Sequence, residues 1–369
     1  MVTADIRLTG FSSRAPLADA LAWIDAHTVA LPVERVALDD ALGRVLAGAI
    51  ASPVDWPSVD CAAMDGYAIS AAETEGASDY NPLPVDAHRL ITAGLPMPAG
   101  TDAVLSFALA QPRGPALDVL APIARGAGVD RRGGMMPAGG IAVPAGTLQA
   151  QHIALLLALG AGPVAVVRKP LVALLVAGPK SGPDLLSPML RALVARDGGV
   201  PEAMALPAAR ADLILIAGRT GAGPDDDAAL TLADAGGVLD MHGIAVRPGD
   251  SAGLGRIGGT PVLLLPGAPH ACLAIYDMLA VRAVRRLAGI QPYEPYFSTE
   301  RLLERKAVSA VGFTDMIQVR ISNTHATPLG PADAGTLASA VRADGFLLVP
   351  ESSEGCPAGA IVRVQVYRS

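Results

Sequence analysis

The stretch LVALLVAG, residues 171–178, is a continuous apolar run that closes on Ala-Gly. Two later stretches have the same character, DLILIAG at 212–218 and PVLLLPG at 261–267. A segment with helical spacing follows each of them, at 184–196, 225–235 and 269–288. Buried strands that alternate with helices predict a doubly wound α/β domain, in which helices cover both faces of a parallel sheet. Since ligands bind such sheets at the carboxyl ends of the strands, we expect the turns after the three runs to share one ligand-binding edge.

The segments on either side predict further domains of different character. Apolar spacing predicts helices over 15–27, 38–46 and 151–161. Gly and Pro separate short apolar runs in 65–145, which is typical of a small β domain, and the alternating tail predicts a small β-barrel. The fold class is therefore multidomain α/β plus β. Its predicted domains are a helical and linker domain at 1–52 with 143–170, an inserted β domain at 53–142, the α/β domain at 171–290 and a C-terminal β domain at 295–369.

Composition excludes several classes of protein. The longest apolar run, 153–167, is too short to span a bilayer, and the first residues lack the pattern of a signal peptide. Three well-separated cysteines argue against disulfide and zinc sites and indicate a reducing cytoplasm. A net charge of −7 gives no sign of a nucleic-acid surface. We expect a cytoplasmic protein that binds neither membranes nor nucleic acids.

The stretch PSVDCAAMDGYAI, residues 57–69, places Asp60 and Asp65 in an otherwise uncharged segment. One interpretation is a β-turn with Asp65-Gly66 at its tip, leading into a strand. The other is a carboxylate held at a functional site.

Two other segments are candidates for binding an anion. AGRTGAGPDDD, residues 217–227, is a Gly-rich turn that runs into a helix; it either binds a phosphate or uses Asp225 to Asp227 to cap the helix. GAGVDRRGG, with Arg125, Arg131 and Arg132 around it, either binds an anion or is a solvated loop.

Taken in order, these segments resemble the molybdopterin molybdenumtransferase family, to which the C-terminal domain of gephyrin also belongs. SPVDWPSVDCAAMDGYAI resembles the family's Ser-Pro-x-Asp-x-Pro…Ala-Met-Asp-Gly-Tyr-Ala motif, and AGRTGAGPDDD resembles Ser-Gly-Gly-Thr-Ser-x-Gly-x-x-Asp. ITAGLPMPAGTDAVL, VRPG…PVLLLPGAP and the tail GTLASAVRADGFLLVPESSEGCPAG have counterparts as well. The resemblance covers nearly the whole chain.

The resemblance implies a four-part homodimer with clefts between its subunits. Its third domain would bind molybdopterin, and molybdenum from molybdate would enter the dithiolene of adenylylated molybdopterin, with AMP leaving and Mg²⁺ assisting. Asp65 and Asp226 would be the catalytic and metal-binding residues. A molybdoenzyme or the adenylylating enzyme would be a protein partner. Residues implied to bind the pterin substrate are Thr92, Arg131, Arg132, Gly218, Thr220, Gly223, Arg247, Pro248, Pro266, Gly267 and Pro269.

The chain departs from the family's pattern around these motifs. Gly134 and Met135 stand where the family has two carboxylates, and Lys180 replaces another acid. The other replacements are Ala93 for Thr, Arg219 for Gly, Asp250 for Lys and Ala268 for Asn. Because Mg²⁺ needs several oxygen ligands, these changes affect the chemistry more than the fold. Three interpretations remain open: a working transferase, a catalytically degenerate homologue that binds or carries the pterin, and a protein-interaction scaffold.

Overall fold

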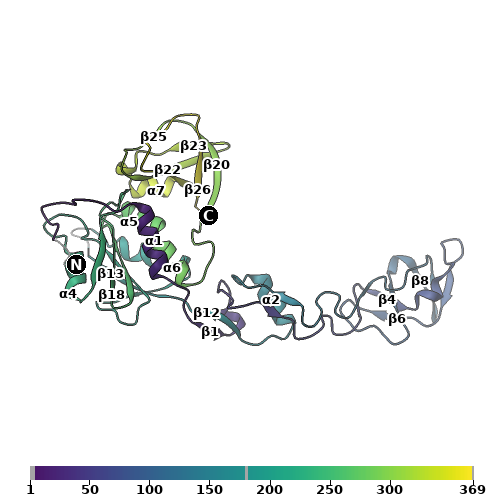
Figure 1. Cartoon of the computed structure of the whole chain (residues 1–369). Coiled ribbons are helices and arrows are strands. Elements are labelled where there is room, and N and C mark those ends of the chain that lie inside the picture. Colours follow the sequence, from purple (N-terminus) through teal and green to yellow (C-terminus); the bar gives the residue numbers. More distant parts are fainter. Residues whose placement is uncertain (1–4, 179–181, 368–369) are drawn as a thin grey trace. The chain divides into compact units, whose positions relative to one another are not determined.

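The computed structural model describes residues 5–178 and 182–367. The chain forms two compact units (Figure 1). The main unit comprises Met1–Glu34, Gly43–Val45 and Val166–Ser369, and the inserted unit comprises Arg35–Leu42 and Leu46–Ala165. The chain passes between the units within β1 (Val33–Val36) and β12 (Val164–Val167), and also on either side of Gly43–Val45. Within the described ranges, no helix is long and apolar enough to cross a membrane.

The three apolar runs form neighbouring parallel strands of a 6-stranded sheet in the main unit. A fourth parallel strand extends the sheet on one side, and two antiparallel strands extend it on the other. In spatial order the strands are β14 (Val200–Ala203), β13 (Leu171–Val176), β15 (Leu213–Ala217), β19 (Thr260–Leu265), β18 (Gly253–Ile257) and β16 (Val238–His242). The prediction of an α/β sheet is confirmed.

Helices cover both faces of this sheet because both faces are apolar. Leu213 and Leu215 of β15 belong to one buried cluster, whereas Ile214 and Ile216, which point the other way, belong to a second. The helices of the main unit that pack with these clusters are α1 (Leu17–His27), α3 (Leu186–Arg196), α4 (Ala228–Asp234), α5 (Pro269–Ile275), the π-helical turn η4 (Tyr276–Ala280) and α6 (Val281–Leu287).

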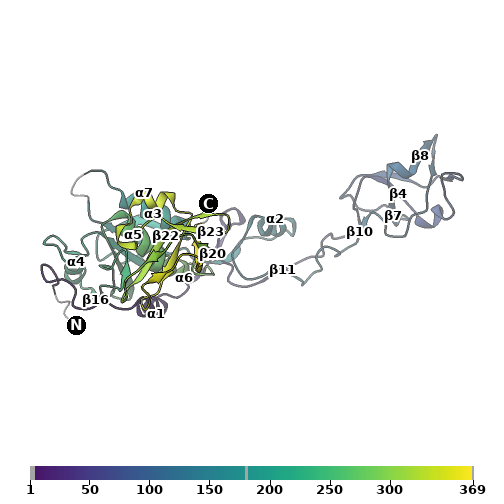
Figure 2. The same cartoon turned by 90° about the horizontal axis from the view of Figure 1, so that it is seen from above.

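The tail forms a closed β-barrel, as predicted. Its strands pair in the order β22, β23, β20, β26 and β24, and pairing of β24 with β22 closes the ring. Figures 1 and 2 both show these strands gathered with α7. The elements are β20 (Phe297–Leu303), β22 (Thr314–Ser322), β23 (His325–Pro328), α7 (Leu337–Arg342), β24 (Gly345–Val349) and β26 (Ile361–Val366), with β17 (Val246–Arg247), β21 (Ala307–Val308), η5 (Ala332–Ala334) and β25 (Gly355–Cys356) beside them.

The inserted unit consists of short strands joined by turns, as its Gly and Pro content predicts. The strands are β2 (Ile50–Ala51), β3 (Cys61–Ala62), β4 (Gly66–Ile69), β5 (Leu83–Val85), β6 (Arg89–Ile91), β7 (Ala103–Leu105), β8 (Ala110–Arg113), β9 (Ala116–Val119), β10 (Val129–Asp130) and β11 (Ile141–Val143). The helices are η1 (Leu38–Asp40), η2 (Ala71–Thr74), η3 (Phe107–Leu109) and α2 (Ala150–Ala158). The predicted helix over 38–46 is wrong: only the turn η1 forms, and Gly43 has a φ of +73°, which is incompatible with a continuing helix.

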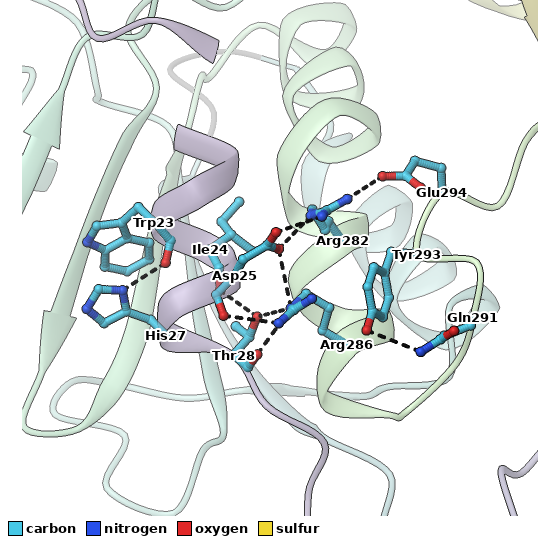
Figure 3. Close-up of polar contacts among 10 residues, drawn as sticks. All are labelled: Trp23, Ile24, Asp25, His27, Thr28, Arg282, Arg286, Gln291, Tyr293 and Glu294. Atoms are coloured by element: carbon cyan, nitrogen blue, oxygen red, sulfur yellow. Dashed lines mark hydrogen bonds and ion pairs between the residues drawn. The ribbon is translucent and has the colours of Figure 1, made fainter. Parts of the chain in front are cut away.

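A polar cluster joins α1 to α6 within the main unit (Figure 3). Both oxygens of Asp25 accept hydrogen bonds from the Arg282 guanidinium, each at 2.7 Å. Arg286 donates to the carbonyl of Thr28 at 3.1 Å, and its guanidinium lies 4.7 Å from the centre of the Tyr293 ring. Because α1 and α6 are far apart in sequence, these contacts fix the N-terminal helix against the α/β domain.

Replacing Asp25 by asparagine is expected to lower the free energy of unfolding by about 1 to 2 kcal/mol at neutral pH, because charged hydrogen bonds are lost. The Arg282 hydrogen bonds lower the pKa of Asp25, so the native state favours the ionised carboxylate. This stabilisation is therefore present above the unfolded-state pKa and disappears as the pH falls through the lowered native value. Urea unfolding at neutral and acidic pH measures it.

The exposed Asp19 on the same helix provides the control. Asp19→Asn is expected to change stability by less than about 0.5 kcal/mol. An Asp25→Asn deficit that persists unchanged in acid would contradict the ion-pair explanation.

Candidate functional site

The carboxyl ends of β13, β15 and β19 surround a pocket of about 360 Å³, which we call the rim pocket. The turns after the three strands contribute Gly178, Gly218 and Gly267, and the start of α3 contributes Leu186. The charged and proline residues in its lining are Pro183, Asp184, Arg219, Asp226 and Pro269. The three strand-ending turns thus share one concave edge, as the sequence predicts.

Two glycines form a floor of bare backbone in the rim pocket. Gly218 has a φ of +94°, and its N–H donates to the carbonyl of Leu265 at 2.9 Å. A Cβ on Gly267 would lie 3.3 Å from the Cα of Gly218, so the two turns are nearly in contact. A flat ligand can therefore approach the main chain here without meeting side chains.

Asp226 closes the Gly-rich turn on which it lies. Its Oδ2 accepts the N–H of Gly223 at 2.7 Å. A Cβ on Gly221 or Gly223 would come within 2.8 or 3.0 Å of the same oxygen, so only glycine leaves room for this carboxylate. Asp227, the residue before α4, makes no side-chain capping bond. The capping interpretation is therefore wrong for Asp227, and Asp226 orders the turn at the wall of the pocket.

Polar contacts of Thr220 stabilise this turn. Its side chain is buried, and Thr220 Oγ1 lies 2.9 Å from the hydroxyl oxygen of Ser251. The Thr220 carbonyl accepts from His242 Nε2 at 3.0 Å. Burial lowers the pKa of His242, whereas its hydrogen bond to the Thr220 carbonyl acts in the opposite direction. The structure gives Thr220 a structural contact, and binding of the pterin by this residue stays a prediction.

Other residues of the predicted binding set lie away from the rim pocket. Arg247 makes a bidentate ion pair with the buried Asp315 of the barrel, at 2.8 and 2.6 Å. Pro248 lines a separate small cavity beside His270, and Pro266 is buried between β19 and Gly267. Lys180, one of the departures noted in the sequence, lies outside the described residues. Of the predicted set, the rim pocket collects Gly218, Asp226, Gly267 and Pro269.

Sequence reasoning did not assign a role to two charged residues of this pocket. Asp184 accepts the N–H groups of Leu186 and Ser187, each at 3.1 Å, and the hydrogen bonds from Ser187 lower its pKa. Its position just before α3 was a usable signal, since Asp is common there. Arg219 was visible only as a departure from the family's glycine.

In the inserted unit, Asp65 is held by the neighbouring loop. Its Oδ1 accepts the N–H of Ala93 at 2.8 Å. Gly66 is the first residue of β4 and pairs with Ile91, and a Cβ on it would lie 2.3 Å from the Leu105 carbonyl oxygen. The segment leads into a strand, as the β-turn interpretation expected, but Gly66 already belongs to that strand and is not the tip of a turn. The glycine is needed because another strand passes close by.

The predicted arginines follow β10, which pairs antiparallel with β3, and so lie at the end of β3 next to Asp60, opposite the end that leads to Asp65. The N–H of Arg132 donates to Asp60 at 2.7 Å, and its guanidinium donates to Asp55 at 2.8 Å. The hydrogen bond from the N–H of Ala138 lowers the pKa of Asp55 most, and the hydrogen bond from Arg132 lowers it further. Arg131 and Thr92 are exposed. Since β3 pairs with β10 and its Ala62 N–H donates to Leu95, the loops that carry Asp65, Thr92 and the arginines are neighbours.

The described residues do not present a ready magnesium site. Asp226 belongs to the main unit and Asp65 to the inserted unit. Within 5–178 and 182–367 there is no group of at least three His, Cys, Asp or Glu side chains that could hold a metal. Mg²⁺ requires near-octahedral oxygen ligands, so the donors within either unit do not fit it.

Comparison with known protein families defines the class to which this fold and pocket belong. Residues 15–160 match the MoeA N-terminal region (domain I and II), and residues 302–367 match the MoeA C-terminal region (domain IV). Between them, residues 190–286 match a probable molybdopterin-binding domain, which includes the turns after β15 and β19. The protein is thus of the class that serves molybdenum cofactor biosynthesis.

Individual relatives narrow this class to one family. The chain is 27% identical over 390 residues to molybdopterin molybdenumtransferase 2 of Mycobacterium tuberculosis, covering 89% of this chain and 94% of that one. It is 24% identical to molybdopterin molybdenumtransferase of Staphylococcus aureus, covering 96% of each. The crystal structure of the molybdopterin biosynthesis MoeA protein from Pyrococcus horikoshii OT3 matches with a TM-score of 0.77 at 25% identity, over 96% of this chain and 100% of that one. The chain belongs to the molybdopterin molybdenumtransferase (MoeA) family.

Proposed function

We propose that this protein is a molybdopterin molybdenumtransferase. It inserts molybdenum from molybdate into the dithiolene of adenylylated molybdopterin, and AMP is released. The observation that carries the proposal is the rim pocket, which lies at the carboxyl ends of the strands in the molybdopterin-binding domain. Relatives named molybdopterin molybdenumtransferase match this chain over nearly their whole length, which supports the proposal.

The contacts within each unit suggest a role for each group of residues. In the main unit, the backbone of Gly218 and Gly267 receives the flat pterin, and Asp226 supplies an ordered carboxylate beside it. In the inserted unit, Asp65 supplies a second carboxylate. The exposed Arg131 of the same unit is suited to anionic molybdate or phosphate.

A homodimer in the cytoplasm is part of this proposal. The family resemblance supports the dimer, and the widely separated cysteines support a reducing compartment. Mg²⁺ enters only through the resemblance, since the described residues of neither unit alone offer a donor set that fits it. We therefore assign no step to the metal.

The proposal is tested with purified protein, adenylylated molybdopterin and molybdate, by following AMP release with and without Mg²⁺. We expect AMP release that depends on molybdate. If the protein retains the pterin nucleotide but releases no AMP, it is a binding homologue and the proposal is wrong. If it neither releases AMP nor retains the pterin, only a scaffold role remains.

A variant with a blocked pocket makes the same assay specific for the site. Gly267→Val adds a branched side chain where a Cβ would already lie 3.3 Å from Gly218, and so fills the floor of the rim pocket. We expect this variant to lose at least about tenfold in affinity for the pterin nucleotide, since a steric clash there displaces the ligand. Equilibrium binding measures this, and unchanged affinity would place the pterin elsewhere.

A further inference from the structure

We propose that Arg219 binds a phosphate group of the pterin nucleotide and exchanges its ion pair with Asp227 for that phosphate. This inference rests on the proposed function, because it takes adenylylated molybdopterin as the ligand of the rim pocket. It adds a binding residue specific to this chain, at a position where the family's motif has glycine.

Arg219 stands where two hollows meet. It lines the rim pocket, and it also lines an adjoining pocket of about 180 Å³ beside Asp227 and Thr231 of α4. Ala177 and Gly218 are common to both linings as well. A ligand longer than the pterin can therefore extend from the rim pocket past the Arg219 side chain.

Arg219 is the positively charged residue in the described lining of the rim pocket. The pocket's other charged residues among those the structure describes are Asp184 and Asp226, and backbone N–H groups already hold both carboxylates. Arg219 is the cation within the described part of the lining. A phosphorylated ligand needs such a cation, and the planar guanidinium donates to two phosphate oxygens at once.

The present partner of Arg219 is one from which it can separate. A single nitrogen of its guanidinium contacts Asp227, at 3.2 Å, and the two side chains are 49% and 41% exposed. Exposed ion pairs of this kind are weak. Arg247, in contrast, makes a bidentate pair with an Asp315 side chain that is 1% exposed. Arg219 can therefore leave its carboxylate partner for a phosphate, whereas Arg247 is held by Asp315.

The backbone at Arg219 makes a clean test available. Its φ is +56°, in the left-handed region that glycine adopts without strain. The Arg219 carbonyl accepts the N–H of Ala228 at 3.0 Å, and glycine would keep that hydrogen bond. Arg219→Gly therefore removes the cation while relieving the backbone, so weaker binding would not result from a damaged fold.

The experiment measures the dissociation constant of adenylylated molybdopterin by titration calorimetry at low and at physiological salt. Arg219→Gln and Arg219→Gly are expected to bind at least about tenfold more weakly than the wild type, since charge-assisted contacts to phosphate are lost. Their affinity should also depend less on salt, because one phosphate contact is gone. The thermal midpoint of Arg219→Gly should equal or exceed that of the wild type.

Arg256→Gln is the matched control. Arg256 pairs with Asp240, also at 3.2 Å, and is 48% exposed, but it lies beside Pro261 at the opposite end of β19. Its replacement should leave both the affinity and the salt dependence unchanged. If Arg219→Gln and Arg219→Gly both bind the ligand as tightly as the wild type does, the inference is wrong and the proposed function still stands. Absence of binding by the wild type would overturn both.

Discussion

Asp65→Asn is expected to release AMP at least about a hundredfold more slowly than the wild type, the scale that a single charged catalytic group contributes. Asparagine keeps an oxygen that can accept the N–H of Ala93, the bond that Asp65 Oδ1 makes at 2.8 Å. The substitution therefore removes the negative charge and preserves the local hydrogen bond. The measurement is single-turnover AMP release from adenylylated molybdopterin in the presence of molybdate.

Two companion variants separate charge from structure. Asp102→Asn is the matched control in the same unit, since Asp102 also accepts a backbone N–H at 2.8 Å, from Ala71, and lies outside the predicted site. It should release AMP at close to the wild-type rate. Asp65→Ala removes both the charge and the acceptor. If Asp65→Asn is as active as the wild type and Asp65→Ala is not, then Asp65 only orders the loop and its catalytic assignment is wrong.

Arg196→Met is expected to lower the free energy of unfolding by about 3 to 5 kcal/mol, because it leaves the buried Asp277 without its cation and leaves Asp197 with only the more distant Arg285, at 3.6 Å. The guanidinium of Arg196 lies 2.7 Å from Asp197 and 3.6 Å from Asp277, whose side chains are 0% and 1% exposed. Tyr276 donates to Asp197 at 3.2 Å, and Tyr296 donates to Asp277, but these hydroxyls carry no charge. Urea unfolding at neutral pH measures the loss.

The pH dependence of the variant identifies the cause. Burial raises the pKa of Asp277 to about 6, although the hydrogen bond from Tyr296 and the charge of Arg196 act in the opposite direction. This native pKa is above the unfolded value of 3.8. The stability that comes from protonated Asp277 is therefore fully present below pH 3.8 and is lost as the pH rises through about 6. Without Arg196 the ionised form is still less favourable. The deficit of Arg196→Met should therefore be larger at about pH 8 than at about pH 5.

Arg191→Met on the same helix provides the control, because Arg191 is exposed. Its effect should remain below about 0.5 kcal/mol. A deficit for Arg196→Met below about 1 kcal/mol, or one that does not change with pH, would show that water reaches these carboxylates.

The sequence predicts the fold best where burial leaves a periodic pattern. The runs that became β13, β15 and β19 are apolar on both faces, as strands of a parallel sheet covered by helices on both sides must be. The strand Phe297–Leu303 was not predicted, because four polar residues interrupt it and its partner β26 lies far along the chain. Pairing across that distance supplies the stability that local sequence does not show.

The candidate site was predictable in position but not in detail. Strand ends located the rim pocket, because the turns of parallel strands must meet at one edge. The partners of individual side chains were not predictable. The hydrogen bond between Asp226 and Gly223 depends on the geometry of the turn. The ion pair of Arg247 depends on Asp315, which belongs to a domain that follows later in the chain.

The edge of the α/β sheet also bears on how copies of this protein avoid aggregation. β14 is the outer strand beside β13, and it contains Pro201 and Glu202. Proline cannot donate a main-chain hydrogen bond and a charged side chain resists stacking, so this edge is a poor template for another strand. The barrel has no open edge between its five strands. Association of two copies through these surfaces would therefore use side-chain contacts rather than continuation of a sheet.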